Sequence, residues 1–171
     1  MTDGVPSRQD AIHLVREDRV RTRELLDRLS PDAFVQSGLG GGTWSPKDLV
    51  GHLETWEQFA LEAIEAIGRG EPAPITGQSL DTDELNRREV ERKAGRSASE
   101  VSTSAMETHD RLLAALAALA DASWTAPEGE DTDRTVGDRL GSILGGSRGF
   151  FRHDPDHWDD LAAFADGPAP G

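Results

Sequence analysis

Histidine is the residue type whose spacing in this sequence suggests chemistry. His153 and His157 are four residues apart, so on a helix their imidazoles would share one face, one turn apart. His52 lies three residues after Leu49 and four before Trp56, on the apolar face of a second predicted helix. Two imidazoles at this spacing and a third from a facing helix give three neutral nitrogen ligands. We therefore predict a metal site of His52, His153 and His157, with zinc, nickel or iron as the divalent ion and one position left for water or substrate.

The alternative interpretation is that each histidine is an ordinary core or surface residue with a hydrogen-bond partner. Two histidines four residues apart often occur by chance, but three that face one interior favour a metal or substrate site. His109 lies on the apolar face of its own predicted helix without a spaced companion, so we expect it in the core or in the lining of a pocket. The candidate substrate-binding residues are Trp56, His109, Phe150 and Trp158, although buried aromatic residues are mainly core. No catalytic residue is assigned.

Pro155 lies between His153 and His157 and removes a backbone hydrogen bond from any continuous helix there. Two outcomes are open. Either a kink at the proline shapes the site, or the helix restarts with Asp154 as its cap and Pro155 at its first position. The second outcome would take His153 out of helical geometry and weaken the metal interpretation. The acids of this segment could contact the metal ligands or act as extra ligands, but a run of charges on a helix surface is usually solvated, and solvation is what we expect for Asp154, Asp156, Asp159 and Asp160.

The elements that must position these residues are helices that begin with a capping box, a Ser or Thr followed three residues later by an acid. Such starts occur four times and predict four long amphipathic helices. The helices begin after Ser7, Ser45, Ser97 and Thr135 and extend over about 8–29, 46–67, 98–119 and 136–164. Trp44 can also pack onto Leu49 across the second start. No alternating run of β-branched residues predicts a strand.

Four long amphipathic helices predict an all-α fold, a four-helix bundle. Residues 68–80 are rich in Gly and Pro and too many for a tight turn, which predicts a long connection between the second and third long helices. Residues 81–94 are expected to add a short helix. At 171 residues the chain is expected to be a single domain, 1–171, that is ordered over about 8–165.

Composition excludes several kinds of chemistry. The sequence has no cysteine and no tyrosine, which removes disulfides, Cys-ligated zinc, a cysteine nucleophile and a phenolic acid or base. A formal net charge of −14 repels polyphosphate, so neither nucleic acid nor an anionic membrane is an expected partner. A small neutral or cationic molecule is favoured instead. No apolar run has the length of a membrane span or of a signal-peptide core, so the cytoplasm is the expected location.

Residues 44–57, WSPKDLVGHLETWE, resemble the W-S-x-K-D-L-x-x-H-L-x-x-W-E helix of the DinB-like superfamily, and most closely that of its ClbS/DfsB branch. Segments 83–86, 99–101 and 109–113 are similar to that branch in order and spacing. His153-x-x-x-His157 resembles the second histidine motif of the superfamily, and the likeness covers about residues 8–165. Asp154 and Trp158 stand where the branch often has tyrosines, so a tyrosine-dependent mechanism is excluded.

This resemblance implies a four-helix bundle with a three-histidine metal site, carried here onto His52, His153 and His157. Many relatives use a low-molecular-weight thiol such as mycothiol, and ClbS-like members protect their producers by hydrolysing a reactive cyclopropane toxin. We therefore expect a detoxification or self-resistance enzyme, a hydrolase or thiol S-transferase, in which a metal activates water or an incoming thiol against a small electrophile or natural-product toxin. The alternatives are a non-catalytic protein that sequesters a drug-like ligand and a mycothiol-dependent isomerase or transferase. A homodimer is among the expected oligomeric states.

Overall fold

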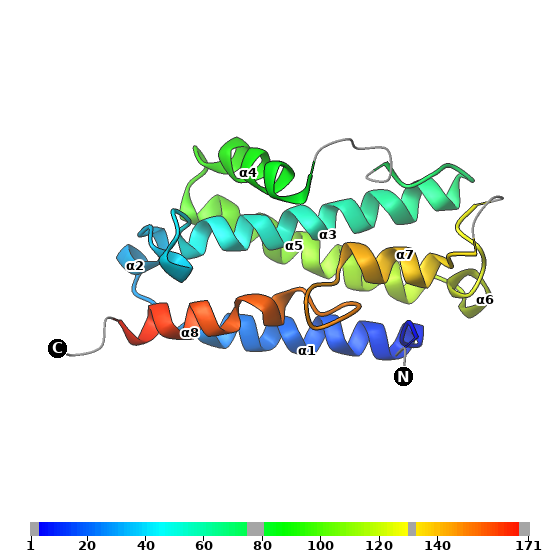
Figure 1. Cartoon of the computed structure of the whole chain (residues 1–171), viewed down its shortest axis with the longest axis horizontal. Helices are drawn as coiled ribbons and strands as arrows, with labels where there is room; N and C mark the ends of the chain where they lie inside the picture. Colours follow the sequence, from blue (N-terminus) through cyan, green and yellow to red (C-terminus); the bar gives the residue numbers. More distant parts are fainter. Residues whose placement is uncertain (1–3, 75–80, 130–132, 168–171) are drawn as a thin grey trace.

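The structure, a computed structural model that describes residues 4–74, 81–129 and 133–167, is all-α, as the sequence predicted. Three long helices, α1, α3 and α5, lie side by side, and two short ones, α7 and α8, follow one another along the fourth side of the bundle (Figure 1). The described residues contain no strand beyond two isolated bridges. In chain order the helices are α1 (Arg8–Leu26), α2 (Pro31–Val35), η1 (Leu39–Gly41), α3 (Pro46–Gly68), α4 (Thr82–Lys93), α5 (Ala98–Ala118), α6 (Asp121–Trp124), α7 (Val136–Ile143), η3 (Asp154–His157) and α8 (Trp158–Asp166).

The predicted helix starts are confirmed. Ser45, Ser97 and Thr135 each make both hydrogen bonds of a capping box, and the Ser7 hydroxyl accepts from the backbone N–H of Asp10. These bonds satisfy amide groups that have no partner inside the first turn of a helix. The same chemistry starts α2, which the sequence analysis did not predict.

The first helix is shorter than predicted. α1 ends at Leu26 rather than near Leu29, and the Ser30 hydroxyl accepts from the backbone N–H of Ala33 to begin α2. Pro31 occupies the first turn of α2, where its missing N–H costs nothing. The Ser-Pro pair therefore both stops one helix and starts the next.

Two clusters of buried aliphatic side chains hold the bundle together. The larger joins α1, α3, α5 and α7, with Leu112, Leu116 and Leu140 fully buried. The smaller joins α1, η1, α3 and α8 through Leu25, Leu39, Leu49, Leu53 and Leu161. Because α3 contributes to both clusters, the helix that carries His52 is packed along most of its length.

The prediction of one continuous last helix over 136–164 is wrong. α7 ends at Ile143, and residues 144–153 form a loop before η3 and α8. Gly146 and Gly149 exchange two backbone hydrogen bonds within this loop, at 3.2 and 3.1 Å. Glycines there permit a close backbone approach that other residues would block. Pro155 lies in the first turn of η3, where a residue without an N–H is tolerated.

The long connection between the second and third long helices contains a short helix, as predicted. α4 packs against α3, and the Nζ of Lys93 donates to the Gly51 carbonyl at 2.7 Å and to Glu54 Oε2 at 2.9 Å. The rest of the Gly/Pro-rich stretch falls partly on 75–80, outside the described residues, as does the tail after Gly167. Among the helices of the described segments, none is long and apolar enough to cross a membrane.

Gly145→Ala should lower the free energy of unfolding by about 1–3 kcal/mol. A Cβ at this position would lie 2.6 Å from the carbonyl oxygen of Gly141 and 3.0 Å from that of Gly149, and neither backbone atom can rotate away. Urea-induced unfolding, followed by circular dichroism, measures the change.

Gly68→Ala is the matched control, because a Cβ there meets nothing within 4 Å at the end of α3. It should leave the free energy of unfolding unchanged or raise it by up to about 1 kcal/mol. Equal stabilities for the two variants would contradict the role given to Gly145 in the break of the fourth helix.

Candidate metal centre

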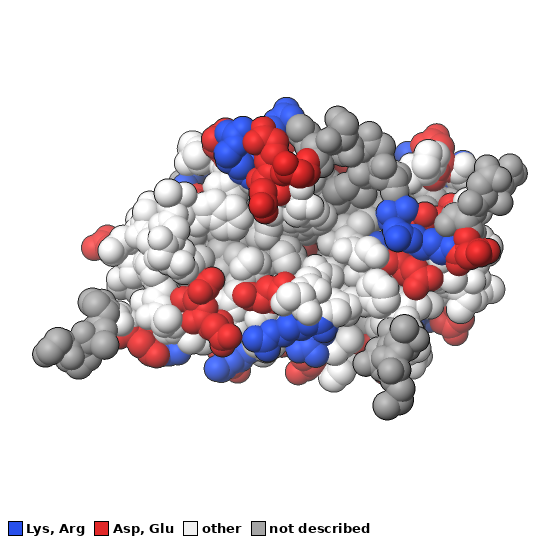
Figure 2. Space-filling view, viewed as in Figure 1, with Lys and Arg blue, Asp and Glu red and all other residues white. Residues whose placement is uncertain are grey.

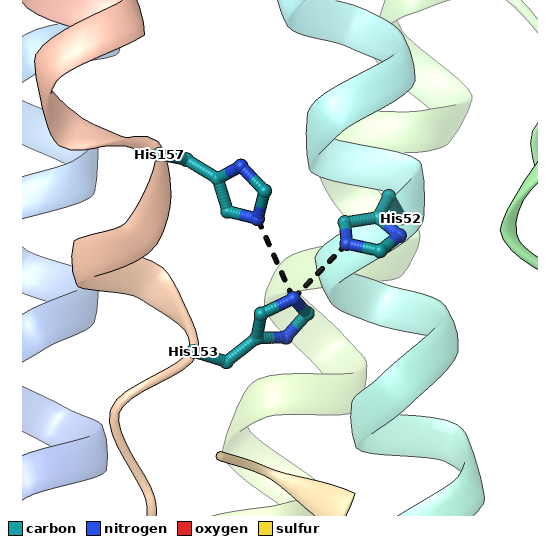
Figure 3. Close-up of side chains that lie close together, drawn as sticks. All are labelled: His52, His153 and His157. Carbon is teal, nitrogen blue, oxygen red and sulfur yellow. Dashed lines mark hydrogen bonds between the residues drawn. The ribbon is translucent and has the colours of Figure 1, made fainter. Parts of the chain in front are cut away.

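Three histidine side chains converge between α3 and η3 (Figure 3). His52 projects from α3, His153 stands at the start of η3 and His157 ends it. Nε2 of His153 lies 3.0 Å from Nε2 of His52 and 3.4 Å from Nε2 of His157. One ring nitrogen from each of the three lies within 4.8 Å of the others. The structure therefore brings together the three residues that the sequence singled out.

Of the two outcomes left open at Pro155, the helix restarts. The new turn is a 3-10 helix with His153, one residue earlier than expected, at its N-cap and Pro155 in its first turn. His153 nevertheless keeps helical dihedral angles, φ −71° and ψ −48°, so the restart does not turn its ring away from His157. The expectation that a restart takes His153 out of helical geometry is therefore wrong.

Burial lowers the pKa of all three imidazoles below the ordinary value. Desolvation is the largest cause at each residue, and at His52 and His153 the neighbouring imidazoles lower the pKa further. The pKa of His153 falls to about 4. At neutral pH the three rings are therefore uncharged, which is the form that ligates metal ions.

This donor set fits a divalent ion. Imidazole nitrogen binds zinc at about 2.0–2.1 Å, which puts neighbouring ligand atoms of a tetrahedron about 3.3 Å apart. The two Nε2–Nε2 separations of 3.0 and 3.4 Å lie on either side of that value. Three protein nitrogens also match the pattern of catalytic sites that leave one position open.

Two tryptophans lie beside the histidines. The ring centre of Trp44 is 5.0 Å from that of His52, and the ring centre of Trp56 is 6.1 Å from that of His153. Nε1 of Trp56 donates to Oδ1 of Asn86 at 3.0 Å, so α4 fixes the orientation of this ring. Sequence reasoning used Trp44 only for the helix start; its place directly before the helix of His52 was the signal that it adjoins the site.

The other predicted substrate-binding residues have different surroundings. Nδ1 of His109 lies 2.7 Å from Oε1 of Glu57, and both residues are buried. Trp158 donates its Nε1–H to the Thr22 hydroxyl at 3.0 Å, and Phe150 packs against the larger apolar cluster. Among the described residues, no hydrogen bond or ring contact joins these three side chains to His52, His153 or His157.

Sequence reasoning missed a buried charge network next to the histidines. The guanidinium of Arg19 donates to both carboxylate oxygens of Asp154, at 2.8 and 3.1 Å, and lies 3.1 Å from Oε1 of Glu57. Burial alone would raise the pKa of Asp154, but Arg19 and a hydrogen bond from Thr22 bring it down to about 2. The expectation that Asp154 is solvated is wrong, because this carboxylate is almost fully buried. The signal was Arg19 itself, a charge four residues after Val15 on the apolar face of its helix.

Comparison with known proteins gives one family and one fold. A model of the DinB superfamily matches residues 14–145, which include His52 but not His153 or His157. The fold resembles the colibactin self-resistance protein ClbS, solved with double-stranded DNA, with a TM-score of 0.71 and 14% identity over 95% of this chain and 96% of ClbS. It also resembles an uncharacterised protein from Escherichia coli UTI89, with a TM-score of 0.78 and 15% identity over 95% of each chain. No curated protein sequence matches the chain.

The ClbS complex corrects one prediction. We excluded nucleic acid because of the net charge of −14, yet a protein of this fold has been solved with double-stranded DNA. A net charge sums the whole surface, whereas contact with DNA depends on the local arrangement of charges. On the face in Figure 2, Lys and Arg side chains gather in a few groups, which lie next to acidic side chains. Overall acidity is therefore no ground for excluding DNA.

Without added metal, the protein should lose stability as the pH falls from 6.5 towards 4. Unfolded histidine titrates near 6.5, whereas the pKa of folded His153 is about 4, so the unfolded state binds more protons in this window. Stability due to the neutral ring is complete above pH 6.5 and is lost below it, by about 3 kcal/mol in full. Urea unfolding at a series of pH values measures the slope.

His153→Gln should reduce this slope because it removes one of the three rings whose pKa is lowered in the folded protein. His13→Gln, which changes an exposed histidine on α1, is the control and should keep the wild-type slope. Identical slopes for the wild type and His153→Gln would show that His153 does not titrate below its ordinary pKa.

Proposed function

Because the chain belongs to the DinB superfamily, we propose that it is a detoxification or self-resistance enzyme that holds a divalent metal ion through His52, His153 and His157 and acts on a small electrophile. The observation that carries this proposal is the convergence of three uncharged imidazoles from two chain segments. The self-resistance role of ClbS, a protein of similar fold, supports the resistance part.

The three histidines would hold the ion, and the rest of the site would shape what meets it. When bound, a divalent ion acts as a Lewis acid and lowers the pKa of water or of a thiol towards neutrality. Neutral imidazoles leave the charge of such an ion uncompensated. Trp44 and Trp56 offer apolar rings that exclude water and against which a flat substrate can stack. Since the sequence has no cysteine, a thiol nucleophile must come from a small molecule such as mycothiol.

The wild-type protein should bind one divalent ion per chain, and His52→Ala should weaken that binding by at least about 100-fold, since it removes one of three ligands. Isothermal titration with zinc, nickel and ferrous iron measures the affinity. A thermal-shift series checks it, because an ion that binds only the folded state at 100 times its Kd adds about 2.7 kcal/mol to stability.

His13→Ala serves as the control, since it removes an exposed histidine and should bind metal as the wild type does. The same proteins are then incubated with an activated cyclopropane or with 1-chloro-2,4-dinitrobenzene, each with and without mycothiol. The products are identified by their masses in mass spectrometry. Opening of the cyclopropane ring by water supports a hydrolase. Ring opening by mycothiol, or replacement of the chloride of the dinitrobenzene by mycothiol, supports a transferase. Full metal affinity or full turnover in His52→Ala would contradict the proposal.

A non-catalytic binding protein is the contrasting outcome of that measurement. The described residues enclose a cavity of about 330 Å³ between α1, α2, α3 and α5, lined in part by Leu26, Phe34, Leu53 and Met106. Its lining does not include Trp56, Phe150 or Trp158, which are three of the four candidate substrate-binding residues of the sequence analysis. Protection that is stoichiometric, with the probe recovered intact, would replace the enzyme by this function.

Double-stranded DNA is a second candidate partner, and the observation that favours it is the DNA complex of ClbS. At a net charge of −14 we expect weak, sequence-independent binding, with a Kd on the order of 10⁻⁴ to 10⁻⁶ M that weakens as salt rises. Fluorescence anisotropy of a labelled duplex at two salt concentrations measures it. An unchanged anisotropy at the highest protein concentration in low salt would remove DNA as a partner.

A further inference from the structure

We propose that Arg19 is a positioning residue for the histidine site: its guanidinium fixes the two chain segments that carry the three imidazoles relative to each other. This inference rests on the proposed function, because its main consequence is a change in metal binding at that site. Arg19 would act through Asp154 and Glu57 and not as a ligand.

The first contact holds the segment of His153 and His157. Asp154 directly follows His153 and precedes His157 by three residues. Its carboxylate accepts from Nε of Arg19 at 2.8 Å, from Nη2 at 3.1 Å and from the Thr22 hydroxyl at 2.7 Å. Because Arg19 and Thr22 are both on α1, three hydrogen bonds tie η3 to one face of that helix.

The second contact holds the helix of His52. Glu57 lies on α3, five residues after His52, and its Oε1 is 3.1 Å from Nη2 of the same arginine. Nδ1 of His109, on α5, lies 2.7 Å from that oxygen. Because a carboxylate only accepts hydrogen bonds, His109 donates here and steadies Glu57 from the opposite side. One guanidinium therefore joins both histidine-bearing segments.

A guanidinium group can fix the relative positions of two carboxylates better than a single ammonium charge can. Its N–H groups lie in one plane with fixed angles, so pairing with two carboxylates sets their separation and their orientation. A lysine would supply the same charge with rotatable donors from a single atom. Nη2 of Arg19 contacts both carboxylates, that of Asp154 and that of Glu57, so shifting η3 along α3 would break at least one of these contacts.

The burial of these charged side chains favours a positioning role over a purely stabilising one. Arg19, Glu57 and Asp154 are exposed by only 8%, 3% and 9%. Buried ion pairs often stabilise a fold no better than apolar side chains of the same volume, because desolvation offsets the attraction. Their directional geometry is what an apolar replacement cannot supply. If the network served stability alone, disturbing it would lower the melting temperature and leave metal binding unchanged.

The test replaces Arg19 by lysine, which keeps the charge and removes the planar fork. Binding of cobalt(II) is measured by competition with a chelator, and the visible absorption of the cobalt protein reports the coordination geometry. Arg19→Lys should bind cobalt about 10-fold more weakly, with a shifted absorption band. This is the lower end of the loss seen when a direct contact to a metal ligand is removed, because Arg19 acts through Asp154 and Glu57. Thr22→Val removes the hydrogen bond that Thr22 donates to Asp154 and the one that it accepts from Trp158, at nearly constant volume. It should show a smaller change of the same kind.

Arg139→Lys is the matched control. Arg139 makes a two-pronged pair with Glu128, at 2.5 and 2.6 Å, that joins α7 to the preceding loop and includes no residue of α3 or η3. It should alter the melting temperature without changing cobalt affinity or absorption. Wild-type affinity and absorption in folded Arg19→Lys would overturn the inference, and if that variant does not fold, the same result in Thr22→Val would do so.

A readout without metal separates this inference from the proposed function. Amide hydrogen exchange of residues 153–158 in the metal-free protein should accelerate in Arg19→Lys or Thr22→Val and not in Arg139→Lys. If the wild type binds no cobalt, the proposed function fails, while faster exchange still supports positioning by Arg19. Unchanged exchange in both variants would overturn the positioning itself.

Discussion

The buried ion pairs of Arg19 are the interaction on which the arrangement around the histidines depends. The fourth side of the bundle is not one continuous helix, because residues 144–153 separate α7 from η3 and α8. Apolar packing is not directional and would allow such a segment to slide. The bonds of Arg19 to Asp154 and Glu57 are directional, and they join α1 to η3 and to α3. These hydrogen bonds between distant parts of the chain fix the position of η3 along α1 and α3, which a continuous fourth helix would otherwise have fixed.

Much of the fold could be predicted because its signals are local. Ser45, Ser97 and Thr135 start helices through contacts with residues only three positions away, and the apolar spacing that follows needs no knowledge of the partner helix. The break after Ile143 could not be predicted with the same rules. A glycine is tolerated in many helices, and here Gly145 is required because the carbonyl oxygens of Gly141 and Gly149 leave no room for a Cβ; folding brings that of Gly149 back against it.

The histidine cluster could be predicted, but the residues that hold it could not. Spacing places His52, His153 and His157 on inward faces, and a bundle then leaves few places for three inward rings to lie. Arg19 and Glu57 are 38 residues apart on different helices, and no short-range pattern connects them. A charge on an apolar face indicates burial without indicating its partner. The pairing of distant charges is a property of tertiary structure, which is why Asp154 was taken for a solvated acid.

We propose that three imidazoles, carried by α3 and by the η3 segment, bind one metal ion. X-ray absorption spectroscopy of the zinc-loaded protein tests it most directly, because the fine structure counts ligand atoms and distinguishes imidazole from carboxylate and water. If His52, His153 and His157 bind the ion together, the fine structure should show three imidazole nitrogens at about 2.0–2.1 Å from the zinc. Fewer than three imidazoles, or a shell composed only of oxygen, would contradict it.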